Sequence, residues 1–119
     1  MNTMVDVGAI GDFASGTMKI VTIQDDDYLL ARVGDEFFAT QARCPHMGGH
    51  LAEGTLEGSV VTCPRHGSRF DLRDGSVVRW TDYSGLTLQV VKVFRSPRSL
   101  TTYPVTVEGE RVLVGTESS

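Results

Sequence analysis

Cysteine is scarce in this chain: its 119 residues include two cysteines and three histidines. So few cysteines exclude a small scaffold held together by several disulfides, and they exclude a metal site built from four thiolates of one chain. Sites that combine cysteine with histidine remain open. The chain is long enough for one ordinary domain with one modest core, so we expect residues 1–119 to form a single domain.

Positive charge and long apolar runs are also scarce. There are 11 Lys and Arg against 15 Asp and Glu, and the net charge is −4. Such a chain has little capacity to neutralise phosphates, so no nucleic-acid partner is expected. No stretch approaches the roughly 20 apolar residues of a membrane helix, and the first residues lack the features of a signal peptide. We therefore expect a soluble, cytoplasmic protein without a membrane partner, whose thiols stay reduced.

The apolar residues alternate with a period near two, and 13 glycines separate them at short intervals. This pattern predicts an all-β fold of many short strands. An acidic turn is expected at 24–27, a bulged strand at 86–94 and a frayed tail at 115–119. The other expected strands are 18–23, 28–33, 37–39, 59–62, 69–72, 77–79, 105–107 and 111–114.

Each cysteine is closely followed by a histidine. His46 lies two positions after Cys44, and His66 lies three positions after Cys63. Two loops of this kind offer two sulfur and two nitrogen ligands, and the glycines behind each histidine offer unhindered N–H groups that suit an anionic guest such as sulfide. Bound zinc and a disulfide between the two cysteines remain as alternatives at this point.

The motifs Cys-Pro-His-Met-Gly from Cys44 and Cys-Pro-Arg-His-Gly from Cys63 resemble the paired motif of Rieske iron-sulfur proteins. The segments 51–75 and 103–105 also resemble Rieske ferredoxins, and the resemblance covers roughly 21–114. It implies a small Rieske-type antiparallel β-sandwich. Two motif loops, near 43–50 and 63–69, would form a cap that binds the cluster.

The resemblance also implies a cofactor, one 2Fe-2S cluster per chain, and its ligands. Cys44 and Cys63 would bind one iron, while His46 and His66 would bind the other. With two thiolates instead of four, the oxidised cluster carries no net charge, so it accepts an electron more readily. The neighbours expected to shield the cluster or to donate hydrogen bonds to it are Pro45, Met47, Gly48, Gly67 and Ser68.

Two departures within the motifs refine the class. High-potential respiratory Rieske proteins join their loops by a further disulfide, whereas this chain has Gly49 and Arg65 where those cysteines are expected. Those proteins also have a serine and a tyrosine near the cluster; Ser68 keeps the hydroxyl, but Phe70 replaces the tyrosine. Because hydrogen bonds to sulfur stabilise the reduced cluster, the reduction potential should lie toward the lower, ferredoxin end of the range.

The resemblance implies a one-electron carrier and not an enzyme, with a flavin-dependent ferredoxin reductase and a terminal oxygenase as transient partners. No second cluster of histidines and carboxylates is left for a mononuclear iron site, and His50 is expected to face solvent. Two alternatives are a small Rieske subunit of a larger reductase, of the nitrite reductase type, and a zinc-binding interaction module. The segment 80–102 is longer than in most Rieske ferredoxins, which predicts an added hairpin that packs on the sandwich or against a second copy.

Overall fold

The computed structural model describes residues 3–45, 48–64, 67–79 and 99–117. Within these ranges the regular structure consists of strands and two single turns of 3-10 helix, η1 (Ile10–Asp12) and η2 (Leu51–Glu53), which confirms the predicted all-β class. The strands are β1 (Met4–Ala9), β2 (Thr17–Ile23), β3 (Asp26–Val33), β4 (Glu36–Gln41), β5 (Thr55–Glu57), β6 (Val60–Thr62), β7 (Arg69–Asp71), β8 (Val77–Arg79), β9 (Thr102–Tyr103), β10 (Val105–Glu108) and β11 (Arg111–Gly115).

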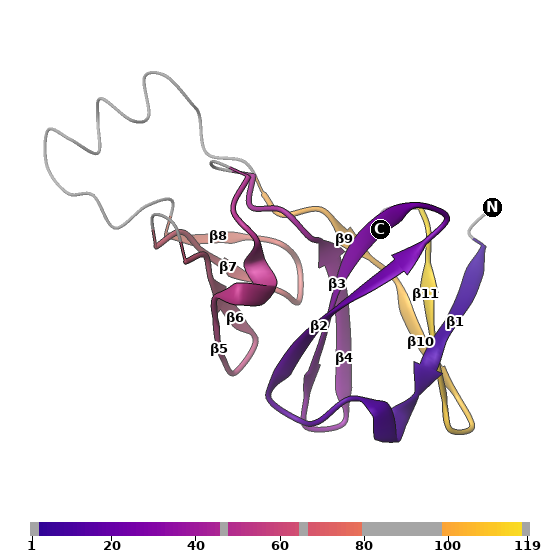
Figure 1. Ribbon diagram of the computed structural model, residues 1–119. Helices are drawn as coiled ribbons and strands as arrows, with labels where there is room; N and C mark the ends of the chain where they lie inside the picture. The colour runs from indigo at the N-terminus through magenta and orange to yellow at the C-terminus, as the bar shows by residue number, and fades with distance from the viewer. Residues whose placement is uncertain (1–2, 46–47, 65–66, 80–98, 118–119) are drawn as a thin grey trace, which may run out of the picture.

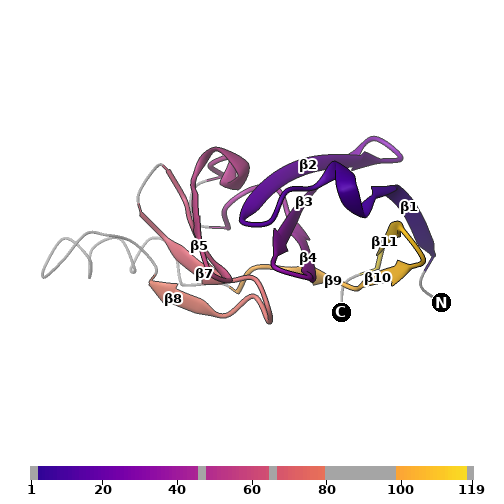
Figure 2. The same ribbon diagram turned by 90° about the horizontal axis from the view of Figure 1, so that it is seen from below.

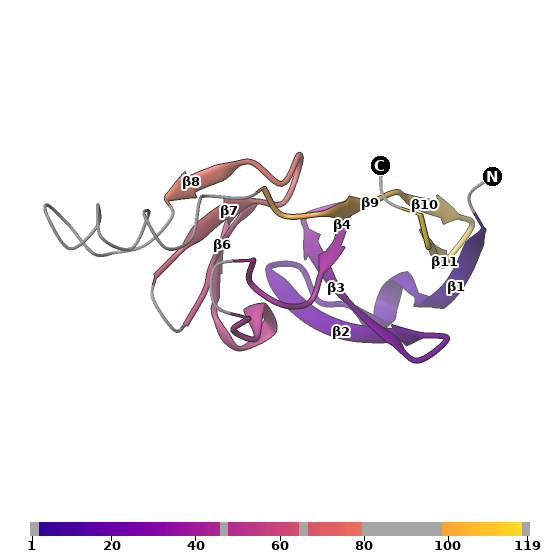
Figure 3. The same ribbon diagram turned by 90° about the horizontal axis from the view of Figure 1, so that it is seen from above.

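The strands form three antiparallel sheets, ordered β1-β11-β10, β2-β3-β4-β9 and β5-β6-β7-β8. The sheet that contains β3 lies in the middle, with β1, β10 and β11 to one side and β5–β8 to the other (Figures 1 and 2). Seen from above, β9 and the chain before it run from the β5–β8 sheet back to the central sheet (Figure 3). The fourth strand of the central sheet, β9, pairs with β4 although it lies about 60 residues later in the sequence.

Strand β3 is the element where the two cores of the protein meet. Its residues 28–31 are all buried, and successive side chains point to opposite faces of a strand. Tyr28 and Leu30 pack in the core shared with β11. Leu29 and Ala31 pack in the other core, which also contains both cysteines. A continuous apolar run is typical of a strand buried on both faces, and it explains why this segment lies at the centre.

The turn before β3 is tighter than the sequence indicates. The predicted acidic turn at 24–27 is wrong in its second half, because Asp26 already pairs with Ile23. The turn consists of Gln24 at φ 51° and Asp25 at φ 70°. Positive φ at both central residues is the pattern of a type I′ turn, which matches the twist of the two strands but suits asparagine and glycine best.

Replacing the turn residues should therefore stabilise the protein. Gln24→Asn combined with Asp25→Gly is expected to raise the free energy of unfolding by about 1 kcal/mol, because glutamine and aspartate bear a steric penalty at positive φ. Thermal unfolding should show a midpoint about 4 °C higher. Gln24→Asn alone should give a smaller gain, and a double variant no more stable than the parent would contradict the turn assignment.

Three strands of the structure, β1, β5 and β9, were not predicted.

The C-terminal end of the described chain also differs from expectation, because the predicted frayed tail is wrong at its start. Gly115 is buried and donates to Pro104 O at 2.8 Å, while the Thr116 amide donates to Thr3 O at 3.3 Å. Arg111 also makes a bidentate ion pair with Asp6 at 2.8 and 2.9 Å, and its hydrogen bonds lower the pKa of that carboxyl. Pairing with β1 therefore holds the C-terminal strand.

Two further predictions concern a part of the chain that is not described. The bulged strand at 86–94 lies outside the described residues, and so does the hairpin expected at 80–102 apart from 99–102. In that remainder, Leu100 is buried in the core with the cysteines, and Thr102 pairs with Thr40 of β4. These last residues therefore belong to the central sheet.

Candidate metal centre

The first motif loop is closed by two backbone hydrogen bonds. The Cys44 amide donates to Gly49 O at 2.8 Å, and the Gly48 amide donates back to Cys44 O at 2.8 Å. Gly48 has φ 72°, a left-handed conformation that glycine adopts without the steric cost borne by other residues. The loop therefore turns sharply and returns to the cysteine from which it started.

The second motif loop repeats this arrangement. The Cys63 amide donates to Ser68 O at 2.7 Å, the Gly67 amide donates to Cys63 O at 3.2 Å, and Gly67 also has φ 72°. In both loops the hydrogen bonds join each cysteine to residues four and five positions later. The two loops thus share one backbone design, although their histidines stand at different positions in the sequence.

Both cysteines are buried, and neither is part of a disulfide. Cys44 is 2% exposed and Cys63 is 3% exposed, and they belong to one hydrophobic cluster with Leu51, Phe70 and Leu72. They form no disulfide, so the disulfide alternative is wrong for this structure. Two buried thiols, each at the start of a closed glycine loop, supply two of the four ligands that a 2Fe-2S cluster requires.

The first loop is anchored by residues that sequence reasoning missed. Arg43 and His50 form an antiparallel bridge at the base of the loop. The Gln41 side chain donates from Nε2 to Arg43 O at 2.7 Å and accepts from the Thr101 amide at 2.7 Å. Gln41 therefore fastens the entry of the loop to the chain leading into β9. A lone glutamine at a strand end gives no sequence signal for this role.

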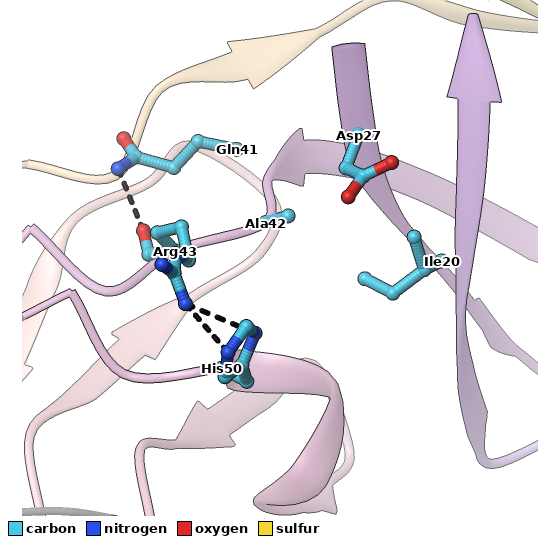
Figure 4. A pocket seen from close by; sticks show the side chains of 6 residues that line it. All are labelled: Ile20, Asp27, Gln41, Ala42, Arg43 and His50. Atoms are coloured by element: carbon cyan, nitrogen blue, oxygen red, sulfur yellow. Dashed lines mark hydrogen bonds between the residues drawn. The ribbon is translucent and has the colours of Figure 1, made fainter. Parts of the chain in front are cut away.

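A pocket of about 430 Å³ lies beside this anchor, and Figure 4 shows its lining. His50 is exposed, as predicted, and its Nδ1 lies 3.2 Å from Arg43 Nη1. Asp27 and Ile20 border the other side of the pocket in Figure 4. The ring of His50 therefore faces a guanidinium.

The second loop depends on a close backbone approach. Gly54 follows η2, and a Cβ atom at this position would lie 1.9 Å from Thr62 O, one residue before Cys63. Glycine is thus the residue that lets η2 lie against the strand entering the loop. Beyond the loop, Ser68 and Phe70 are both completely buried. Ser68 is therefore shielded from water.

A second pocket of about 340 Å³ opens next to Cys63. Gly54 and Thr62 line it, together with Cys63, Pro64, Gly67 and Arg79. Arg79 is exposed, and its Nε donates to Gly67 O at 3.0 Å. This arginine was also missed, because nothing in the sequence connects it with the motif.

Four of the motif residues, His46, Met47, Arg65 and His66, lie outside the described residues. Among the residues that are described, no group of three or more His, Cys, Asp and Glu side chains comes together. The structure therefore brings the two thiols into one core, and the assignment of the imidazoles rests on the sequence.

A family model decides which fold family this is. The model of the Rieske [2Fe-2S] domain matches residues 3–104. The chain belongs to this family. Its cofactor is accordingly a 2Fe-2S cluster, as predicted, and the zinc-module alternative is set aside.

Curated relatives point to the ferredoxin branch of the Rieske family. The ferredoxin component of the naphthalene 1,2-dioxygenase system of Pseudomonas aeruginosa is 30% identical over 110 residues, 92% of this chain and 92% of the relative. The ferredoxin component of biphenyl 2,3-dioxygenase of Rhodococcus jostii (strain RHA1) is 36% identical over 107 residues, 90% of this chain and 87% of the relative. This Rieske protein is similar to both over nearly their whole length.

Solved structures give the same result for the fold. A chain in the complex of reduced oxygenase and oxidized ferredoxin of carbazole 1,9a-dioxygenase matches with a TM-score of 0.78 and 30% identity, covering 98% of this chain and 95% of that one. The ferredoxin of carbazole 1,9a-dioxygenase from Nocardioides aromaticivorans IC177 matches with a TM-score of 0.77 and 25% identity, covering 97% and 99%. The predicted Rieske-type architecture is confirmed, and this Rieske protein is an electron carrier, not an enzyme.

Proposed function

We propose that this chain carries single electrons from a flavin-dependent ferredoxin reductase to a terminal oxygenase. The observation that supports this most strongly is the pair of equivalent loops, each with a buried cysteine outside any disulfide, in a chain that aligns with nearly whole ferredoxin components of oxygenase systems. These relatives are ferredoxin components that this chain spans almost end to end, which favours a transient shuttle over the alternative of a small subunit in a larger reductase.

We assign the cluster ligands as Cys44 and Cys63 on one iron and His46 and His66 on the other. When bound, the 2Fe-2S cluster accepts and returns one electron. Each glycine loop fixes the backbone around its own cysteine, because each loop is closed by its own pair of backbone hydrogen bonds. A carrier benefits from such rigidity, since little of its structure needs to rearrange when its charge changes.

The surrounding residues control the dielectric near the thiolates. Leu51 and Phe70 are completely buried beside the cysteines and exclude water from that side. We propose that Ser68 donates a hydrogen bond toward the cluster, and that Pro45 and Met47 shield it from solvent. The amides of Gly48 and Gly67 are already engaged by the cysteine carbonyls. Their contribution is to shape the loops.

Three further proposals concern the whole chain. Residues 1–119 form one domain, because both cores share β3. The location is cytoplasmic, where reducing conditions keep both thiols available for iron. No helix among the described residues is long and apolar enough to cross a membrane.

Association of two copies through 80–102 stays a prediction, checked by measuring the mass of the loaded protein over a range of concentrations.

The function is tested by reconstituting this chain with a purified flavin-dependent ferredoxin reductase and a purified terminal oxygenase from the same organism. We expect oxygenase turnover to require this protein and to saturate as its concentration rises. The matched control is Cys63→Ser protein, which should support no turnover. Turnover that proceeds equally without the chain would contradict the proposal, and so would a chain that elutes only with a large reductase subunit and does not reduce the oxygenase.

The histidine assignment predicts a change in reduction potential. His46→Cys or His66→Cys should lower the potential toward the all-thiolate range, on the order of −400 mV, because each substitution adds a thiolate charge. Ser68→Ala should lower it by less, through the loss of one hydrogen bond. Protein-film voltammetry of the loaded variants measures both effects. An unchanged potential in a loaded cysteine variant would contradict the ligand assignment.

A further inference from the structure

The guanidinium of Arg79 is hydrogen-bonded to the second motif loop. Arg79 ends β8, and its Nε donates to Gly67 O at 3.0 Å. Gly67 in turn donates its amide to Cys63 O at 3.2 Å. A short chain of hydrogen bonds therefore leads from a permanent positive charge to the backbone of the residue that we assign as a ligand.

The same charge borders the hollow beside the thiol. Arg79, Gly67 and Cys63 all line the pocket of about 340 Å³, and the carboxylate-bearing residue on this pocket is Glu53. Arg79 is exposed, and the partner that it reaches among the described residues is a backbone carbonyl, which an uncharged donor could also satisfy. The positive charge of Arg79 therefore lies where it can act electrostatically on the second motif loop.

A second arginine, Arg69, makes the position of Arg79 unfavourable for the stability of the sheet. Arg69 of β7 stands directly opposite Arg79 in the ladder, beside a register shift between Arg69 and Phe70. Like charges that face each other across two strands destabilise a sheet. Arg69 reaches Glu57 at 3.4 Å, but within the described part of the chain its Nε is buried without a hydrogen-bond partner. Two cations are therefore kept next to the loop at some cost in stability.

We infer that Arg79 raises the reduction potential of the cluster by placing a fixed positive charge on the Cys63 loop. Reduction adds one electron and hence one negative charge, which a nearby cation stabilises, and the buried surroundings of Cys63 weaken the screening of this attraction. The inference depends on the proposed ligation by Cys63, and it adds a residue outside the motif to the groups that set the potential.

The test is the reduction potential of Arg79→Gln in the cluster-loaded protein. We expect the equilibrium constant for reduction to fall about tenfold, equivalent to about 59 mV for a one-electron couple. Arg79→Lys keeps the charge and should retain most of the potential. The matched control is Arg73→Gln, which removes an exposed arginine paired with Glu36 at 3.8 Å and should change the constant less than about twofold.

Iron content and the thermal unfolding midpoint of each variant show whether the loop is intact. A loaded Arg79→Gln protein with an unchanged potential would overturn the inference while leaving the ligand assignment untouched, since that assignment is tested by cluster loss in Cys63→Ser. Equal decreases of the reduction potential in Arg79→Lys and Arg79→Gln would also overturn the inference. They would show that the potential responds to a shift of the loop and not to the loss of the positive charge. If the glutamine variant fails to load, Glu53→Gln decides: removing the opposite charge from the same pocket should raise the potential, and an unchanged or lower value overturns the inference.

Discussion

Cys63→Ser is expected to abolish cluster binding, so that the purified protein is colourless and its iron and labile sulfide fall to background. The thiol is nearly fully buried and stands at the start of a closed loop. A serine hydroxyl fits the same space, but it does not ionise at neutral pH and is a much poorer iron ligand than a thiolate. Anaerobic purification followed by visible spectroscopy with iron and sulfide analysis measures the effect.

The matched control for this variant is Thr62→Ser, one residue earlier on β6. It also changes a small side chain beside the loop, and Thr62 lines the same pocket, but it leaves both thiols in place. This control should keep its full iron and sulfide content. A Cys63→Ser protein that binds iron and sulfide as the parent does would show that the second loop does not supply a thiolate ligand.

Gly75→Ala is expected to lower the free energy of unfolding by roughly 3 kcal/mol, the largest change in stability that the structure predicts. Gly75 has φ 77°, and a Cβ atom there would lie 1.9 Å from Leu100 O. The Leu100 amide donates to Gly75 O at 2.7 Å, and the Leu100 side chain is buried in the core with both cysteines. The substitution therefore pushes the β5–β8 sheet away from the segment around Leu100 that leads into β9.

Gly16→Ala separates the two causes of this loss. Gly16 has nearly the same backbone angle, φ 79°, but nothing lies within 4 Å of the position of its Cβ. Its substitution should cost only about 1 kcal/mol, the penalty of a left-handed backbone. Chemical denaturation of both variants measures the difference. Equal losses would mean that the close approach to Leu100 adds nothing.

The strands were predictable where alternation was strong and two neighbours paired locally. Strands β2, β4, β10 and β11 follow from apolar alternation and short turns, and β3 follows from its continuous apolar run. β1 was missed because its partner, β11, lies at the other end of the chain, and no local pattern reports such pairing. β5 and β9 are three and two residues long. Each contains a single apolar residue, so no alternation can show.

The chemistry of the site was predictable, whereas its mechanical support was not. Paired cysteines and histidines mark the metal centre because few other sites use those residue types at that spacing. The equivalence of the two loops depends on hydrogen bonds made by backbone atoms, and the spacing of the histidines conceals it. Gln41 joins the first loop to Thr101, 60 residues later, and Arg79 supports the second loop from the end of β8. Only the folded structure brings them there.

The ligand assignment is tested most directly by pulsed electron paramagnetic resonance of the reduced protein grown with nitrogen-15 histidine. The account predicts couplings from two histidine nitrogens at the cluster, with one coupling lost in a loaded His46→Cys or His66→Cys protein. Both couplings should remain in His50→Ala, because His50 is exposed beside Arg43. A coupling that disappears in His50→Ala, or two that persist in His46→Cys, would contradict the assignment.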